Sequence, residues 1–335
     1  MKKVLENYII SIVYMIVTCF IIVLPNYIFR DRDSYIYYAA FSDELMKDYS
    51  RNGIEILLVN EPLFLLINKF LSFFISPYSV PVFFTIFSFT IFFYFLQKSS
   101  RNILMIFFGL ILYFTITYTF HLQFVILRQS IATSFFLIVL YYVKDIKIIL
   151  LACIILGFIH SSFFFILILL IINYFSNNFI KQEVWSILFQ SLFFFILGYV
   201  SLIVASYIGF RQAEGLLDTE VSVGGGSWVL WLLVTIYLIF WGDRSNKVLY
   251  NYTIVGMISF LSLYFSTPFI GRLVASFIPA IILLIVSKFR AIDIIVVFLI
   301  LIPYTYLLSN GVLFNLSFAV NSHELSVARF FDNFW

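Results

Sequence analysis

Long apolar runs dominate this sequence and leave only short polar breaks between them. Several of the runs are about 20 residues long, the length that a helix needs to cross the hydrocarbon core of a bilayer. Because they lack the alternating pattern of a membrane β-barrel, we expect helices, which satisfy their own backbone hydrogen bonds. The runs cover residues 8–29, 62–76, 78–96, 102–120, 124–143, 147–159, 161–175, 184–205, 228–241, 247–265, 269–287 and 291–308.

The composition also indicates a membrane-embedded chain. Of the 335 residues, 63% are hydrophobic and only 11% are charged, which is more apolar surface than a soluble domain can hide. We therefore predict one integral membrane domain over residues 1–335, an all-α polytopic protein with about 11 transmembrane helices (range 10–12). Its partner is the lipid bilayer, and no nucleic acid is expected. Cys19 and Cys153 both fall inside apolar runs, so we expect no disulfide framework, no metal and no cofactor.

The positions of Lys and Arg predict how the chain is threaded. Short breaks that carry these residues are typical of cytoplasmic connections. They are MKK, QKSSRN, KDIK, NNFIKQE, GDRSNK and SKFR. All of them are cytoplasmic if residues 147–175 form a pair of short helices and a segment near 56–76 re-enters the membrane or lies in its interface. The N-terminus is then cytoplasmic, and its long apolar stretch is a retained first span.

The remaining polar segments face outward in this topology, including the HLQ break, Ser161 and STPFIGR. Residues 30–61 form an acidic, Tyr-rich external loop, residues 206–227 form a second external loop, and residues 309–335 form an external tail. The rival threading makes 62–76 a true crossing and 147–175 a single long one. It places QKSSR and KDIK outside, against the charge bias, so we favour the first threading.

Two arginines lie close to the start of an apolar run, Arg128 in LRQSIATSFFL and Arg272 in GRLVASF. A guanidinium at bilayer depth costs about 2.5–3.5 kcal/mol, so such residues are rare and usually functional. In the favoured topology both face outward, where their planar forks suit phosphate oxygens. The structural alternative is that each side chain snorkels to the headgroups. Small and hydroxylated neighbours favour helix faces that pack into a bundle.

Other polar side chains on the predicted outer side are candidates for proton transfer or substrate contact. His160 interrupts a long apolar stretch and can serve as base, acid or phosphate donor, with a helix-capping role as the alternative. Glu61 and Asp33 can deprotonate a sugar hydroxyl, although Glu61 also fits a simple helix start before a proline. Asp31 resembles Asp33 in this respect, whereas His121 fits a structural role better. Candidate substrate contacts are Arg211, Tyr37 and Gln129.

Several of these segments together resemble the EpsG-type branch of the Wzy exopolysaccharide and O-antigen polymerases. They are RDRDSYIYY, NEPLFLLIN, LRQSIATSFFL, GFIHSS and GRLVASF, in that order over about residues 30–280. The resemblance implies a GT-C-like helical bundle in the bacterial inner membrane, with its active site on the periplasmic side. It implies a glycosyltransferase that moves a growing chain from undecaprenyl pyrophosphate to the non-reducing end of a new lipid-linked repeat unit. A chain-length regulator protein is a candidate partner.

The resemblance also implies roles for individual residues. Arg128 and Arg272 would hold the donor pyrophosphate. His160 would hydrogen-bond the leaving group or orient the acceptor, and Glu61 or Asp33 would act as the base. Since the leaving group is already a lipid pyrophosphate, the arginines can stabilise it without a metal or cofactor. The second outer loop departs from the family, because FRQAEGLLDTEV offers a single basic residue to an anionic substrate.

Two other functions fit a polytopic chain of this kind. A flippase or transporter for lipid-linked oligosaccharides would carry charges deep within its helices and often shows repeat symmetry. Here the charges gather toward one side, and midspan positions are almost purely apolar. An O-antigen ligase would use the same donor and similar arginines, but the second outer loop is short for a ligase. We therefore favour the polymerase.

Overall fold

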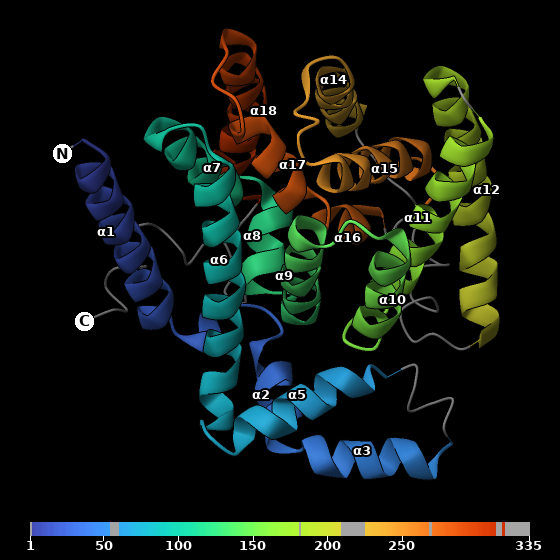
Figure 1. Cartoon of the computed structure of the whole chain (residues 1–335). Helices are drawn as coiled ribbons and strands as arrows, with labels where there is room; N and C mark the ends of the chain where they lie inside the picture. Colours follow the sequence, from blue (N-terminus) through green and yellow to red (C-terminus); the bar gives the residue numbers. More distant parts are fainter. Residues whose placement is uncertain are drawn as a thin grey trace.

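Helices account for nearly all of the regular structure in the computed structural model (Figure 1). The structure describes residues 2–53, 60–180, 182–208, 225–267, 270–312 and 317–318. Within these ranges the one β contact is an isolated bridge between Phe29 and Phe318. The prediction of an all-α fold is confirmed for the described residues.

Four described helices are long and apolar enough to cross a membrane. They are α1 (Lys2–Val23), α6 (Val80–Ser99), α11 (Ser162–Phe179) and α18 (Ala291–Ser309). A fifth candidate is the pair α7 (Ile103–Thr115) and α8 (Thr117–Phe124), which bends by 77°. These long apolar helices indicate a multi-pass membrane protein. Helix length supports four or five crossings, so the figure of about 11 stays a prediction.

The remaining described helices complete the bundle and the layer at its end. Most are apolar but shorter than a full crossing, and the apolar stretch described within α12 is Trp185–Val200. They are α2 (Arg32–Ala40), α3 (Ser42–Arg51), α5 (Pro62–Ser72), α9 (Leu127–Tyr142), α10 (Ile146–Gly157), α12 (Glu183–Ile208), α14 (Gly225–Trp241), α15 (Lys247–Leu263), α16 (Ile270–Ala275) and α17 (Ile278–Val286), with short 3-10 turns η1 (Asn26–Ile28) and η2 (Pro77–Ser79).

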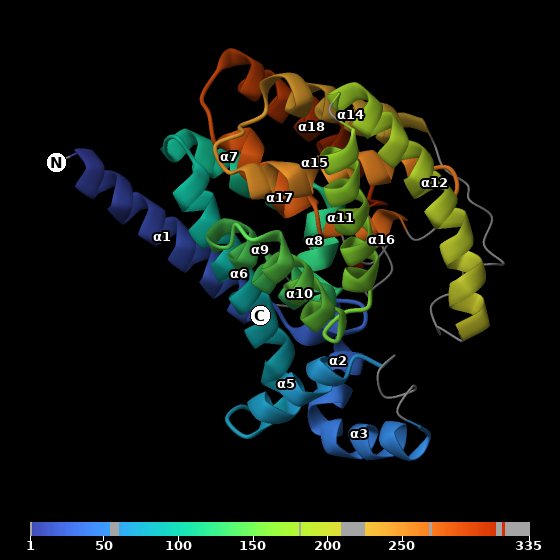
Figure 2. The same cartoon turned by 45° about the vertical axis from the view of Figure 1, so that its right-hand side comes forward.

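Helices α2, α3 and α5 lie across one end of the bundle (Figures 1 and 2). Helices α2 and α3 occupy much of the predicted outer loop 30–61, so this connection is largely helical. Helix α5 falls in the segment predicted to be re-entrant or interfacial. Asp43 of α3 and Lys69 of α5 form an ion pair of 2.6 Å that joins the two helices. We call these three helices the cap.

A buried arginine fastens the cap to the bundle. Arg32 of α2 donates from Nε to the carbonyl of Phe124 at 2.8 Å and from Nη2 to Oγ1 of Thr85 at 2.9 Å. Its guanidinium carbon also lies 5.1 Å from the centre of the Phe29 ring. These contacts join α2 to α6 and α8, and they fix the position of the residues that surround Arg32 in the sequence.

Helices α10 and α11 form the predicted pair in place of a single long crossing. The chain turns between Gly157 and Ser162, and the turn contains His160. Gly157 permits the close approach of the two helices, because a Cβ there would lie 2.5 Å from the ring of Phe164. The pair therefore presents His160 at a fixed, tight turn.

Two runs that were predicted as single helices are broken. Residues 102–120 divide into α7 and α8, and residues 269–287 divide into α16 and α17. At the first break Thr119 donates its hydroxyl to the carbonyl of Tyr113 at 2.6 Å, which supplies a partner for that acceptor. After the second break Pro279 lies in the first turn of α17, where its missing N–H costs nothing. The prediction of continuous helices is wrong at both points, since hydropathy does not reveal such local breaks.

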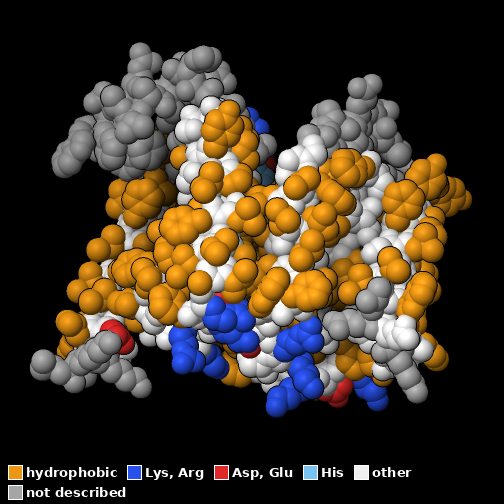
Figure 3. Space-filling model, turned by 90° about the horizontal axis from the view of Figure 1, so that it is seen from above, with side chains coloured by type: hydrophobic (Ala, Val, Ile, Leu, Met, Phe, Trp, Pro, Cys, Tyr) orange, Lys and Arg blue, Asp and Glu red, His pale blue; other side chains and the backbone are white. Residues whose placement is uncertain are grey.

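The short connections that carry Lys and Arg meet at the other end of the bundle from the cap. The N–H of Arg101, between α6 and α7, donates to the carbonyl of Val286 at 3.4 Å. Asn246, between α14 and α15, donates to the carbonyl of Leu140 at 3.3 Å. Figure 3 shows Lys and Arg side chains gathered in one region of this end. We call the Lys and Arg residues of these connections the basic face; they are Lys98, Arg101, Lys144, Lys147, Arg244, Lys247, Lys288 and Arg290.

Helix α9 joins the two ends of the molecule. It begins at Leu127 beside the cap and ends at Tyr142 beside the basic face. At 1.5 Å per residue, its 16 residues span about 24 Å. Arg128 and Lys144 therefore lie at opposite ends of the bundle, as the favoured threading requires.

Candidate functional site

Glu61 lies between an arginine and a histidine that come from distant parts of the sequence. Its Oε2 accepts a hydrogen bond from Nη1 of Arg128 at 2.5 Å, and its Oε1 lies 2.8 Å from Nδ1 of His160. The backbone N–H of Ser161 donates to the same Oε1 at 3.0 Å. Only 5% of the Glu61 side chain and 26% of the Arg128 side chain are exposed. We call these four residues the Glu61 cluster.

Backbone contacts bring the segments of the Glu61 cluster together. The N–H groups of Leu63 and Phe64, at the start of α5, donate to the carbonyl of Phe158 at 3.1 and 3.4 Å. The N–H of Leu63 has no acceptor within its own helix, whereas that of Phe64 also donates to the carbonyl of Glu61 at 3.0 Å. Phe158 belongs to the turn that contains His160, so these bonds hold the start of α5 against that histidine.

The two residues with left-handed backbone conformation both line one cavity. Among the described residues other than glycine, only Asp31 (φ 61°) and Glu61 (φ 58°) have positive φ. Strained backbone of this kind costs about 1–3 kcal/mol and clusters at functional sites. At Glu61 the surrounding hydrogen bonds hold the strained residue in place, and they direct its carboxylate toward Arg128 and His160.

The Glu61 carboxylate is ionised at neutral pH. Burial alone would raise the pKa of this group, but the His160 ring, the Arg128 guanidinium and the N–H of Ser161 stabilise the anion and lower its pKa to about 2. Such a carboxylate is a weak base near neutrality. Because a carboxylate only accepts hydrogen bonds, Nδ1 of His160 carries a proton, which leaves Nε2 as the ring nitrogen that can accept one.

Aromatic rings surround the Arg128 guanidinium. Its carbon Cζ lies 4.9 Å from the centre of the Tyr38 ring, 5.6 Å from that of Phe64 and 5.9 Å from that of Tyr35. Arg128 is the second residue of α9, and a cation is unfavourable near the N-terminus of a helix. The rings and the Glu61 carboxylate compensate for that position. They hold the guanidinium inside the protein. A side chain that only snorkelled to the headgroups would not need these partners.

A cavity of about 410 Å³ opens beside the Glu61 cluster. Both Arg128 and Arg272 line it, although the two residues are 144 positions apart in the sequence. The cavity also brings together carboxylates and imidazoles, two kinds of group that can transfer protons. The lining residues are Asp31, Ser34, Tyr35, Tyr38, Asn60, Glu61, His121, Val125, Ile126, Arg128, His160, Ser161 and Arg272.

A second part of the lining carries Arg272, His121 and Asp31, which we call the Arg272 group. Arg272 lies on the six-residue helix α16 and is exposed. It makes no ion pair or side-chain hydrogen bond with the rest of the described chain. Nδ1 of His121 lies 3.4 Å from the hydroxyl of Ser317, and its ring interacts electrostatically with both Arg272 and Asp31. The Arg272 guanidinium is therefore available to a ligand in the cavity.

Gln129 connects the helices that carry the two arginines. Its Nε2 donates to the carbonyl of Arg272 at 2.6 Å and to the hydroxyl of Ser276 at 2.7 Å. Thr133, one turn further along α9, lies 3.3 Å from the same hydroxyl. Both α9 side chains are buried, as predicted for helix faces that pack into a bundle. Gln129 thus fixes α16 against α9, and it is not among the residues that line the cavity.

The other predicted residues lie away from the cavity or outside the described chain. Asp33 and Tyr37 are exposed on α2 and are absent from the lining. Asp31 precedes α2 with left-handed backbone and lines the cavity, whereas Asp33 lies in the first turn of the helix and does not. The structure therefore gives no support to Asp33 as the base. Arg211 lies outside the described residues.

The observed roles of His121 and Arg32, both at the cap end of the molecule, were not predicted. His121 was assigned to structure, yet it lines the cavity. A usable signal was its place in the short break HLQ, on the same predicted side as Arg128 and a few residues before it. Arg32 had no such signal, since nothing in RDRDSY distinguishes a buried arginine from an exposed one.

The cavity holds groups that can bind an anion and move a proton. Two guanidinium groups supply positive charge, and the imidazole of His160, oriented by Glu61, supplies a basic nitrogen. Within the described residues, no three His, Cys, Asp or Glu side chains gather in a way that could hold a metal ion.

Comparison with known protein families covers nearly the whole chain. The model that describes the EpsG family matches residues 7–322. No curated protein and no solved structure matches the chain.

Proposed function

This chain belongs to the EpsG family, which is linked to exopolysaccharide biosynthesis, and from that premise we propose that it is a repeat-unit polymerase. In this proposal it is a membrane glycosyltransferase. It transfers the growing polysaccharide, an exopolysaccharide or O-antigen, from undecaprenyl pyrophosphate to the non-reducing end of a new lipid-linked repeat unit.

One observation carries the proposal: a single cavity joins an oriented histidine to two arginines of different character. Arg128 is paired with Glu61 and held by aromatic rings. Arg272 is exposed and unpaired within the described chain. A donor with a pyrophosphate and an acceptor with a hydroxyl need these two functions together, a cationic site for the first and a base for the second.

His160 is the proposed base. An acceptor hydroxyl attacks the anomeric carbon of the sugar that is attached to the donor pyrophosphate. The proton of that hydroxyl passes to Nε2 of His160, while the Glu61 carboxylate stabilises the charge that forms on the ring. The resemblance alone assigned the base to Glu61 or Asp33. The low pKa of Glu61 favours a supporting role for this carboxylate instead.

The two arginines act on the leaving group. The bond between the anomeric carbon and the pyrophosphate oxygen breaks, and its electron pair stays on that oxygen. Arg272 binds the pyrophosphate of the donor, and Arg128 stabilises the developing charge with the N–H groups that Glu61 does not use. The products are a polymer one repeat unit longer on its lipid carrier and free undecaprenyl pyrophosphate. No cofactor takes part in this scheme.

The proposal includes an orientation and an architecture. The basic face lies at the far end of α9 from the cavity, which supports a cytoplasmic basic face and an external site. The N-terminus is then cytoplasmic, and the location is the bacterial inner membrane. A GT-C-like bundle of about 11 crossings requires the shorter apolar helices to cross as well. A chain-length regulator protein remains a proposed partner.

The proposal is tested with purified protein in liposomes that contain one undecaprenyl pyrophosphate-linked repeat unit. The wild-type protein is expected to produce a ladder of longer lipid-linked chains. Arg128→Lys is expected to abolish the ladder, because an ammonium cannot hold Glu61 and present a planar fork at once. The matched control is Arg101→Lys on the basic face, which is expected to leave the ladder unchanged.

Other outcomes point to other functions. Normal ladder formation by Arg128→Lys would refute the role of this residue. Movement of the repeat unit across the bilayer without elongation would identify a flippase. Transfer of the repeat unit only to added lipid A-core would identify a ligase.

A further inference from the structure

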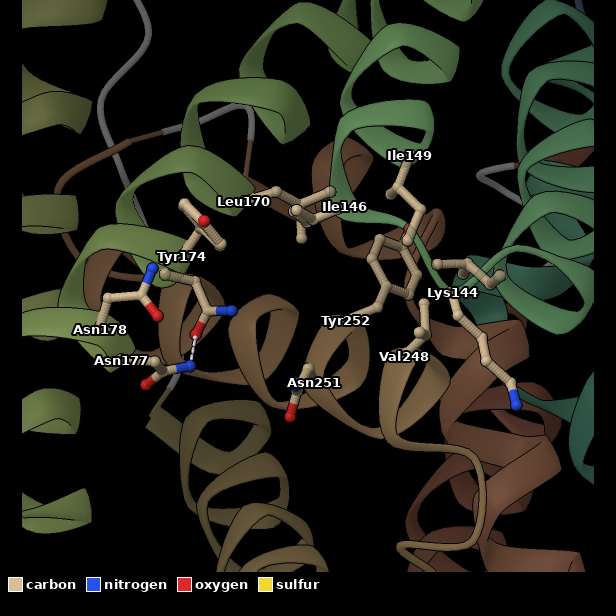
Figure 4. A pocket seen from close by; sticks show the side chains of 12 residues that line it. Lys144, Ile146, Ile149, Leu170, Tyr174, Asn177, Asn178, Val248, Asn251 and Tyr252 are labelled. Carbon is tan, nitrogen blue, oxygen red and sulfur yellow. Dashed lines mark hydrogen bonds between the residues drawn. The ribbon is translucent and has the colours of Figure 1, made fainter. Parts of the chain in front are cut away.

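A second pocket lies at the opposite end of α9 from the Glu61 cluster. It has a volume of about 260 Å³ and lies among α9, α10, α11 and α15 (Figure 4). Lys144 of the basic face is part of its lining. Nothing in the proposed transfer reaction uses this pocket, because the reacting groups lie at the cap end.

The rim of this pocket is rich in carboxamides. Figure 4 shows Asn177, Asn178 and Asn251 spread along one side of the opening, with Lys144 at its far end. Asn177 donates to Oδ1 of Asn173 at 3.0 Å. The side chains of Asn178 and Asn251 make no hydrogen bond with the rest of the described chain. Each carboxamide offers both donors and an acceptor, a combination that suits the hydroxyl groups of a ligand.

The inner wall of the pocket is apolar. Leu140, Ile146 and Leu170 line it from three different helices. The outer surface of α10 beside it is also apolar, since 55% of Leu151 and 48% of Ile155 are exposed. In a membrane protein such a surface faces lipid chains. The pocket therefore opens where polar and apolar surroundings meet.

The charge of the lining favours an anion. Of the described residues that line the pocket, Lys144 alone carries a charge. The adjacent carboxylate of Asp145 caps α10 by accepting from the N–H of Lys147 at 2.9 Å, and it is not part of the lining. One ammonium group suits one phosphate, and the neighbouring basic residues raise the local concentration of anions.

We propose that this pocket binds the headgroup of an anionic glycerophospholipid from the leaflet next to the basic face. The phosphate lies at Lys144, the glycerol hydroxyls lie at the carboxamides of α11 and α15, and the acyl chains follow the apolar wall. An amphipathic pocket with a single cation matches this ligand in charge and in polarity. A soluble sugar phosphate would match the polar and charged rim of the pocket but not its apolar wall.

The test measures lipid binding to the full-length protein by native mass spectrometry. Phosphatidylglycerol and phosphatidylcholine are added in turn to delipidated protein in detergent. Lys144→Ala is expected to weaken binding of phosphatidylglycerol about fivefold, the effect of one Lys near an anionic surface. Asn251→Leu is expected to weaken it as well without any change of net charge. Lys147→Ala on the same face is the matched control and is expected to bind like wild type.

Several results would overturn the proposal. Equal losses in Lys144→Ala and Lys147→Ala would mean general attraction to the basic face. Equal binding of the two lipids would mean that the pocket does not select an anion. Full competition by soluble glycerol 1-phosphate would mean that the ligand is a free phosphate and not a lipid. All three substituted side chains are exposed, and thermal unfolding in phosphatidylcholine confirms that each variant is folded.

Discussion

The Glu61 cluster and the Arg272 group line the same cavity but are built in different ways. In the Glu61 cluster every charged group has a partner, and the carboxylate is almost completely buried. In the Arg272 group the guanidinium is exposed on a six-residue helix and has no ion-pair partner in the described chain. Two arginines that look equivalent in the sequence therefore differ in how far they are organised before a ligand arrives.

This difference separates two tasks that a transferase must perform. A group that directs proton transfer must keep its geometry, and a buried, fully paired network does so because any movement leaves a charge unsolvated. A group that captures a large anion must be reachable, and an unpaired exposed cation retains its charge for the ligand. The comparison predicts that substitutions in the Glu61 cluster reduce turnover, whereas substitutions in the Arg272 group weaken substrate binding.

The largest effect is expected from Glu61→Gln. The amide can donate to Nδ1 of His160 and so stabilise the wrong tautomer, and we expect a fall in polymerase turnover of about 10,000-fold, as when the carboxylate of a catalytic triad is changed to an amide. Removal of one partner from a buried ion pair should also lower the free energy of unfolding by about 3–5 kcal/mol. Polymerisation assays and unfolding in detergent measure the two effects.

The pH dependence sharpens the expectation for Glu61. The folded-state pKa of about 2 lies below the ordinary value of 4.5. The stabilisation by the carboxylate is therefore complete above about pH 4.5 and is lost as the pH falls toward 2. The difference in unfolding free energy between wild type and Glu61→Gln should shrink over that window. Asp43→Asn, which removes an exposed ion pair, is the control and should cost less than about 1 kcal/mol.

The next effect concerns the two histidines of the cavity. His160→Ala should lower turnover about 1,000-fold, within the range for loss of a general base. His121→Ala should lower it only about tenfold, because that ring would at most add one hydrogen bond to the substrate. The assay compares the two turnover numbers at saturating lipid-linked repeat unit. A larger loss in His121→Ala than in His160→Ala would identify His121, in the Arg272 group, as the base.

A smaller effect, of a different kind, is expected at Arg272. Arg272→Ala should raise KM for the lipid-linked repeat unit about tenfold with little change in kcat, since an exposed cation contributes attraction that salt screens. Arg272→Lys should retain most of this attraction. Raising the ionic strength should raise the KM of wild type more than that of Arg272→Ala. A loss confined to kcat would instead assign Arg272 to the fixed part of the site.

The sequence predicts which residues lie at each end of the molecule better than it predicts which residues are in contact. The positions of Lys and Arg predict that Arg128 and Lys144 lie at opposite ends, because one apolar run of known length separates them. Hydroxylated neighbours of Arg128 likewise predict that this part of α9 is buried. The division of 102–120 and 269–287 into two helices each could not be predicted, since it depends on single side-chain hydrogen bonds and on one proline.

The pairing within the cavity was even less accessible to prediction. Glu61 and His160 were both identified as candidates, but 99 residues separate them and only the folded turn of α10 and α11 brings them together. Their proximity changes the interpretation of each, because the histidine lowers the pKa of the carboxyl group that was predicted to be the base. Chemistry of this kind depends on tertiary distance, which local sequence patterns do not contain.

The smallest effect is expected at Asp33, which lies next to the residues of the cavity but is not part of its lining. Asp33 and Asp31 are two residues apart, but only Asp31 lines the cavity. Asp33→Asn should leave turnover within about twofold of wild type, as for most exposed substitutions away from a site. Asp31→Asn should have the larger effect, and asparagine tolerates the left-handed backbone that this position requires. Loss of activity in Asp33→Asn with normal activity in Asp31→Asn would instead return the role of base to Asp33, and the organised character of the Glu61 cluster would then serve stability alone.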